Sequence, residues 1–202
     1  MKNIIRTPLF KLSIISSLLL FFSIMYGKKF WSELWMIYGF IEIGIIVLFS
    51  VVLIVSLVFW IRRRHLYSYI FIPFCINILF LVLVILLPLN WIKDRLEFSF
   101  YYNRYEVASD LAIKAKPDSA SYLYMLPSGY QSLSVGGGEV LVTNKEKANA
   151  VLFFTFRGVP DGMSGFVKIK NSKKNNYLIR QIFNEVYQIE DLGNNWYYVS
   201  GN

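Results

Sequence analysis

The sequence predicts a membrane α-helical region of three transmembrane helices, followed by a small α+β domain with a mainly antiparallel sheet. The first reason is composition: 55% of the residues are hydrophobic and 17% are charged, whereas about 25% charged residues is usual in soluble proteins. The second is that the apolar excess lies before Trp91, in runs of roughly the 20 residues that cross a bilayer. After residue 93 the pattern changes to an amphipathic helix and short strands. We therefore expect a transmembrane region, 1–92, and a domain, 93–202.

The first predicted span, about residues 8–26, is the weakest of the three because its apolar run is short and contains serines. Thr7 and Pro8 favour a helix start, since threonine caps helices and proline suits the first turn. A cleaved signal peptide is the alternative, because a basic segment precedes the apolar one. However, residues 24–27 lack the small side chains of a cleavage site. The pattern favours an uncleaved anchor.

The second and third predicted spans, about 37–61 and 66–89, enclose the short basic loop 62–65. Arginines are costly to translocate, so this loop is expected on the cytoplasmic face. The N-terminus is then inside, and everything after Trp91 is outside. The connection 27–36 falls on the outer side, either as one or two helical turns in the interface or as a loop. The basic residues that determine this topology are Lys2, Arg6, Lys11, Arg62, Arg63 and Arg64.

Aromatic and polar residues mark particular depths in the predicted membrane region. Tryptophans are typical of membrane interfaces, and the expected belt residues are Trp31, Trp35, Trp60 and Trp91. Glu42 lies near the outer end of the second span, where it is expected to reach interfacial water. Asn77 lies near the middle of the third span, where a hydrogen bond between helices is the simplest expectation. A role in a transport assembly is an alternative, because ionisable groups within membranes are often functional.

Residues 93–202 are predicted to form an extracytoplasmic α+β domain that begins with a juxtamembrane helix over about 96–116. Apolar residues recur there at three- and four-residue spacing, which indicates an amphipathic helix. Gly193-Asn194-Asn195 favours a hairpin between the last two strands. The segment 177–188 is ambiguous between helix and strand. The predicted strands are 122–126, 139–143, 150–156, 165–170, 187–192 and 196–199.

The residue types of the domain exclude several catalytic chemistries. Residues 93–202 contain neither histidine nor cysteine, which removes Ser-His-Asp and Cys-His mechanisms and His/Cys metal sites within the domain. We predict no cofactor and no metal. Glu106 and Asp110 stand four apart on one helix face and could act as an acid–base pair, but a solvated polar face is favoured. A Ser–Lys pair is the other option, drawn from Ser128, Ser132 or Ser134 with Lys145 or Lys147.

Three features could bind a ligand. Arg157 follows a dense apolar strand and is expected either to form an ion pair, with Asp161 as a candidate partner, or to bind an anion. The glycines 136–138 indicate a turn or bulge, or a close approach of the backbone to a ligand. A basic patch could contact anionic headgroups or acidic envelope polymers, or simply protect an edge strand. Its members are Lys168, Lys170, Lys173 and Lys174.

These patterns favour a non-enzymatic interaction module anchored in a bacterial plasma membrane. Beyond the lipid bilayer, the expected partner is a protein or another envelope component, as for an accessory subunit or an immunity-type protein. Nucleic acid is not expected, because most of the net charge of +8 lies in the membrane region and is explained by topology. The alternatives are a small membrane enzyme that uses carboxylates or a Ser–Lys pair, and a subunit of a transport assembly.

Overall fold

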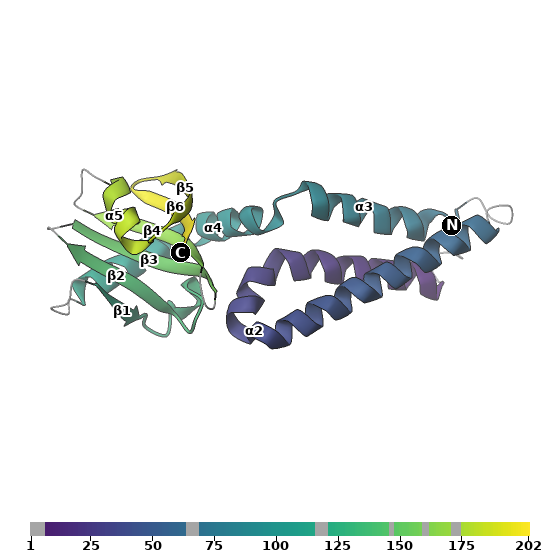
Figure 1. Cartoon of the computed structure of the whole chain (residues 1–202), viewed down its shortest axis with the longest axis horizontal. Coiled ribbons are helices and arrows are strands. Elements are labelled where there is room, and N and C mark those ends of the chain that lie inside the picture. Colours follow the sequence, from purple (N-terminus) through teal and green to yellow (C-terminus); the bar gives the residue numbers. More distant parts are fainter. Residues whose placement is uncertain (1–6, 64–68, 116–120, 146–147, 159–161, 171–174) are drawn as a thin grey trace. The chain divides into compact units, whose positions relative to one another are not determined.

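The computed structural model, shown in Figure 1, describes residues 7–63, 69–115, 121–145, 148–158, 162–170 and 175–202. The chain divides into two compact units. The first contains residues 1–30 and 34–93, and the second contains residues 31–33 and 94–202. The first unit is helical and apolar, whereas the second contains all of the described strands.

Helix α2 (Pro8–Arg63) is the longest element of the helical unit and reverses direction at Trp35. Trp35 has a φ of 42° and a ψ of −120°, which no helix accommodates. The Tyr38 hydroxyl donates to the Ser23 carbonyl oxygen over 2.7 Å and lies 2.8 Å from the Ser23 hydroxyl. Fifteen residues of straight helix would separate these side chains by about 22 Å. We name the two antiparallel parts the first arm, residues 8–34, and the second arm, residues 36–63.

The expected connection at 27–36 is helical apart from Trp35, which agrees with the helical alternative and not with a loop. Helix α3 (Ile72–Leu86) follows, with Pro73 in its first turn, where a proline removes no helical hydrogen bond. Helix α4 (Leu89–Lys114) begins directly after Pro88 and is irregular at Tyr101.

The apolar N-terminal helix is confirmed, but the number of membrane spans is not. Among the described residues, α2 is the one helix that is by itself long and apolar enough to cross a membrane. A second candidate arises if α3 and α4 are counted together as one broken span. Helix α3 alone has 15 residues, about 22 Å of helix, which is less than the hydrocarbon core of about 30 Å. The topology with three spans stays a prediction.

The second unit contains the predicted antiparallel sheet. Its six strands lie in the order β1-β2-β3-β4-β6-β5, and every neighbouring pair is antiparallel. A 3-10 helix, η1 (Gln131–Leu133), precedes β2, and the ambiguous segment contains helix α5 (Asn175–Ile182) followed by a strand. The strands are β1 (Ser121–Met125), β2 (Glu139–Lys145), β3 (Ala148–Arg157), β4 (Met163–Lys170), β5 (Val186–Gly193) and β6 (Trp196–Gly201).

Helices cover both faces of this sheet. On one face, Phe98 and Tyr105 of α4 pack on Phe153 and Phe166, with Trp196 beside them. Their ring centres lie close, for example 4.8 Å between Phe98 and Phe166. On the other face, α5 packs against alternate residues of the same strands, including Leu152, Val167, Ile169 and Val199. Successive residues of β4 therefore face opposite sides of the sheet, and both of its faces are buried.

Gly165 allows β3 and β4 to approach each other where β3 bulges between Phe154 and Phe156. A β-carbon on Gly165 would lie 2.0 Å from the Phe153 carbonyl oxygen and 2.8 Å from a Leu152 methyl carbon. Neither the backbone oxygen nor the packed leucine can move away without disturbing the central pair of strands. The close approach therefore requires glycine.

We expect Gly165→Ala to destabilise the domain by about 3 kcal/mol, the upper end for overpacking a core. Urea unfolding of the full chain in detergent, followed by near-ultraviolet circular dichroism, would measure the change. Gly129→Ala is the matched control, because no atom lies within 4 Å of its added β-carbon. Equal unfolding midpoints for the two variants would contradict this account.

Candidate functional site

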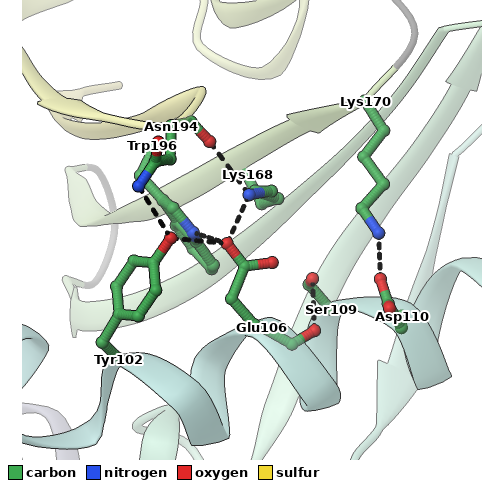
Figure 2. Close-up of polar contacts among 8 residues, drawn as sticks. All are labelled: Tyr102, Glu106, Ser109, Asp110, Lys168, Lys170, Asn194 and Trp196. Atoms are coloured by element: carbon green, nitrogen blue, oxygen red, sulfur yellow. Dashed lines mark hydrogen bonds and ion pairs between the residues drawn. The ribbon is translucent and has the colours of Figure 1, made fainter.

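Glu106 is the centre of the largest polar cluster between α4 and the sheet (Figure 2). Three donors from different elements converge on its Oε1 atom. The Lys168 Nζ lies 2.5 Å away, the Trp196 Nε1 2.8 Å and the Tyr102 hydroxyl 3.0 Å. Tyr102 and Glu106 are four residues apart and so share one face of α4. The cluster thus joins a helix, the central strand β4 and the last strand β6.

Lys168 is the most buried charge of the cluster, with 9% of its side chain exposed. Its Nζ also donates to the Asn194 carbonyl oxygen over 2.9 Å and lies 5.2 Å from the centre of the Trp196 ring. The Asn194 amide nitrogen in turn donates to the Tyr102 hydroxyl over 3.1 Å. Asn194 has a φ of 51° and Asn195 a φ of 61°, values that asparagine tolerates in hairpin turns. The predicted hairpin turn therefore places a carbonyl oxygen against the lysine.

The charges in the cluster follow from these contacts. Burial raises the pKa of the Glu106 carboxyl, but the hydrogen bonds from its three donors and the charge of Lys168 outweigh burial and leave the pKa below its ordinary value. Burial, with the hydrogen bond to Glu106, raises the pKa of the Tyr102 phenol. At neutral pH the site therefore holds an ionised carboxylate and a protonated phenol. Such a carboxylate is a weak base, and its Oε1 atom is occupied by three donors.

Asp110 is paired with a different lysine from the one that binds Glu106. It forms an ion pair with Lys170, one pair further along the same helix and strand, and this pair is more exposed than the first. The Ser109 hydroxyl between the two acids donates to the Glu106 backbone carbonyl oxygen over 2.8 Å. The structure therefore engages Glu106 and Asp110 with separate lysines. Sequence spacing predicted their common helix face but could not identify these partners.

The lysine pairs also revise the predicted basic patch. Lys168 and Lys170 point at α4 and are bound by its two acids, so they do not form an open cationic surface. Lys173 and Lys174 lie outside the described residues. Neither interpretation of the patch anticipated ion pairs within the domain, because residues 106 and 168 are far apart in the sequence.

Arg157 forms an ion pair, but with a partner that the sequence did not suggest. Its Nη1 lies 2.6 Å from Glu139 Oε2 at the start of β2. Its guanidinium also lies 4.9 Å from the centre of the Phe154 ring. Asp161, the expected partner, is outside the described residues. The contact with Glu139 agrees with a structural role for Arg157.

Ser134 and the glycine run occupy structural positions, whereas Ser128 and Ser132 are exposed. The Ser134 hydroxyl donates to the Glu139 carbonyl oxygen and accepts from the Phe154 backbone N–H over 3.0 Å, which links a loop to β3. The glycines 136–138 all have positive φ, and a β-carbon on Gly138 would lie 2.6 Å from Gln131. These are turn requirements. The Lys145 side chain and Lys147 are outside the described residues. Within the described ranges, no group of three His, Cys, Asp or Glu residues could hold a metal ion.

The helical unit contains a second polar cluster, centred on Asn77. The Asn77 Oδ1 accepts from the Ser17 hydroxyl over 3.0 Å, and its Nδ2 donates to Ser13 Oγ over 3.3 Å and Ser56 Oγ over 3.2 Å. All four side chains are buried. The cluster therefore ties α3 to both arms of α2. The sequence suggested a bond between helices at Asn77 but treated the serines of the first run only as a weakness.

The other predicted membrane residues lie on α2 or at helix ends. Arg62 and Arg63 form the basic last turn of α2, and Lys11 is exposed on the first arm. Glu42 is half-buried on the second arm. Trp31, Trp35 and Trp91 are exposed, and the Trp60 ring stacks on Phe74 with centres 5.4 Å apart. The residues Lys2, Arg6, Arg64 and His65 lie outside the described ranges.

Replacing Glu106 with glutamine should leave Lys168 buried without its counter-charge and cost about 1–3 kcal/mol. A carboxyl whose folded pKa is lowered stabilises the fold above its unfolded pKa, about 4.3, and this contribution disappears as the pH falls through the folded value. The stability gap between wild type and Glu106→Gln should therefore be constant near neutral pH and shrink in acid.

Urea unfolding of both proteins between neutral and acidic pH would measure this gap. Asp110→Asn is the matched control, because it removes a more exposed ion pair and should cost at most about 1 kcal/mol. A gap between wild type and Glu106→Gln that grows in acid would contradict the assigned charge states.

Asn77→Leu should loosen the helical unit by about 1–2 kcal/mol, because it removes hydrogen bonds between helices while keeping a similar volume. Detergent-induced unfolding of the purified protein would measure the loss. Ser50→Ala is the control: the Ser50 hydroxyl bonds the Ile46 carbonyl oxygen of its own helix and is exposed. If both variants unfolded like the wild type, Asn77 would contribute nothing to packing.

Comparisons with known proteins give no relative from which a role could be transferred. No protein-family model matches the chain. Searches of characterised proteins and of solved structures also find no significant match. The role of the domain must therefore be inferred from its own side chains and from the helices that precede it.

Proposed function

We propose that this chain is an integral protein of the bacterial plasma membrane that holds a small α+β domain on the extracytoplasmic side as an interaction module. The N-terminus is cytoplasmic, and both arms of α2 and the α3 region cross the bilayer. The domain binds a protein or another envelope component and carries out no catalysis itself. The observation that carries the proposal is the reversal of α2 at Trp35, which makes two apolar helices from one long one.

The packing of the helical unit supports three spans. Each arm of α2 exceeds the roughly 20 residues that a span requires, and large apolar side chains such as Phe40, Ile54 and Leu79 are exposed on the arms and α3. Lipid would cover them. Ser13, Ser17 and Ser56, by contrast, are buried around Asn77, as expected where no water is available to satisfy polar groups.

The orientation is inferred from charge. Arg62 and Arg63 end the second arm, and the positive-inside bias favours the cytoplasmic face for that end. The turn at Trp35 is then on the outer side. The domain follows α3 on that same side, provided that the α3 region crosses once.

The polar cluster favours binding over acid–base catalysis. A general acid or base needs a carboxyl that can reach a substrate and exchange its proton near the working pH. Glu106 accepts three hydrogen bonds, and its pKa is lowered. Asp110 is held by Lys170. Both acids are thus used to fasten α4 to the sheet, which leaves the exposed surfaces of a stable domain for recognition.

Thiol labelling of intact cells tests the topology. In a Cys75→Ser background, Tyr187→Cys places a thiol on an exposed position of β5, and His65→Cys places one in the predicted cytoplasmic loop. An impermeant reagent should label position 187 in intact cells and position 65 only after lysis. Labelling of 65 but not 187 before lysis would reverse the orientation and overturn the proposal.

A further inference from the structure

Helix α4 has a second apolar face that the domain does not use. Leu96, Phe100 and Val107 are 61%, 83% and 47% exposed. Their spacings of four and seven residues place them along one side of the helix. The opposite side carries Phe98 and Tyr105, which are buried against the sheet. A helix that is apolar on both sides is expected to be covered on both.

Phe100 is the most exposed residue of this apolar face. It is more exposed than any other large hydrophobic residue that the structure describes, including Phe40 on the apolar second arm at 77%. Several exposed large apolar side chains on one side of a helix are typical of a surface that binds a protein or a membrane. We call Leu96, Phe100 and Val107 the α4 stripe.

Charge and position select a lipid surface for the α4 stripe. On a helix, Lys93, Arg104 and Lys114 fall on the same side as the stripe, and the Arg104 guanidinium also donates to the Gly129 carbonyl oxygen. The acids Glu106 and Asp110 are neutralised by Lys168 and Lys170 of the sheet, although the Asp110 side chain is 47% exposed. The outer side of α4 therefore combines apolar residues with cations, although Glu97 also lies near it. This combination is typical of helices that lie in an anionic membrane interface.

The short chain between Trp91 and Leu96 also limits how far the α4 stripe can lie from the membrane. Leu96 follows Lys93 by three residues, about 5 Å of helix. If the chain leaves the hydrocarbon near Trp91, as the proposed topology requires, Leu96 lies within the headgroup layer, which is about 5–7 Å deep on each side. An apolar stripe that begins in this layer has the bilayer within reach before any other partner.

We propose that the α4 stripe docks on the anionic phospholipid interface of the membrane that carries the helices, an inference that rests on the proposed membrane anchor. The three apolar side chains would enter the boundary between headgroups and acyl chains, about 5–10 Å deep. The cations beside them would meet lipid phosphates. The sheet would then lie on top of α4, with its far face and its edges turned towards the envelope.

Spin labels on the full chain test the docking. Each variant carries Cys75→Ser and one new cysteine, and is reconstituted into vesicles of phosphatidylethanolamine and phosphatidylglycerol. Phe100→Cys and Val107→Cys report on the α4 stripe, Ile54→Cys on the second arm, and Tyr187→Cys on an exposed aromatic position of β5. Collision with oxygen, which partitions into lipid, is compared with collision with a water-soluble nickel chelate.

Labels at 100, 107 and 54 should collide mainly with oxygen, and the label at 187 mainly with nickel. Replacing phosphatidylglycerol by phosphatidylcholine should move 100 and 107 towards nickel while 54 stays unchanged. If the label at 100 collided mainly with nickel while the label at 54 still collided mainly with oxygen, the docking would be overturned and the membrane anchor would stand. Shielding of 100 from both agents would mean that protein covers the stripe, which also overturns it. Nickel access at 54 would remove the anchor itself.

Discussion

The ion pair between Glu106 and Lys168 is the interaction on which the arrangement of the domain depends. A lysine in the middle of a covered sheet must be paired, because an isolated buried charge is very costly. Glu106 meets this need from α4, and it also accepts from Trp196 of β6. One carboxylate thus determines how far along the sheet the helix can lie. Further contacts follow the same helix, from Asp94 with Tyr198 to Asp110 with Lys170.

The helical unit meets the same physical requirement with uncharged groups. Asn77 uses both ends of its amide, accepting from one serine of the first arm and donating to another and to Ser56 of the second arm. In each unit, polar atoms enclosed by apolar ones are satisfied by partners from separate elements. These bonds are directional, whereas apolar packing alone would tolerate sliding of one helix along its neighbours. Polar clusters therefore specify the alignment that hydrophobic burial stabilises.

Local sequence patterns predicted the helices and strands of this chain better than the contacts between them. The alternation of Val167 and Ile169, the Asn194-Asn195 turn and the period of α4 all follow from neighbouring residues, and the structure contains each of them. The pairing of Glu106 with Lys168 depends on strand order, which periodicity does not encode. The sequence predicted a connection at 27–36, but it gave no signal for the positive φ of Trp35, because a positive φ normally favours glycine or asparagine. Only tertiary contacts such as Ser23 with Tyr38 can hold it.

The position of β6 has a consequence for the order in which the domain is made. This strand is the last in the sequence, yet it lies between β4 and β5 and pairs with both. While residues 196–201 remain in the ribosome, β4 has an open edge and β5 has no strand to join. Trp196, which completes the core and the contacts of Glu106, is missing at that stage. The domain therefore matures only after translation has passed this strand, whereas the helices of the first unit emerge much earlier.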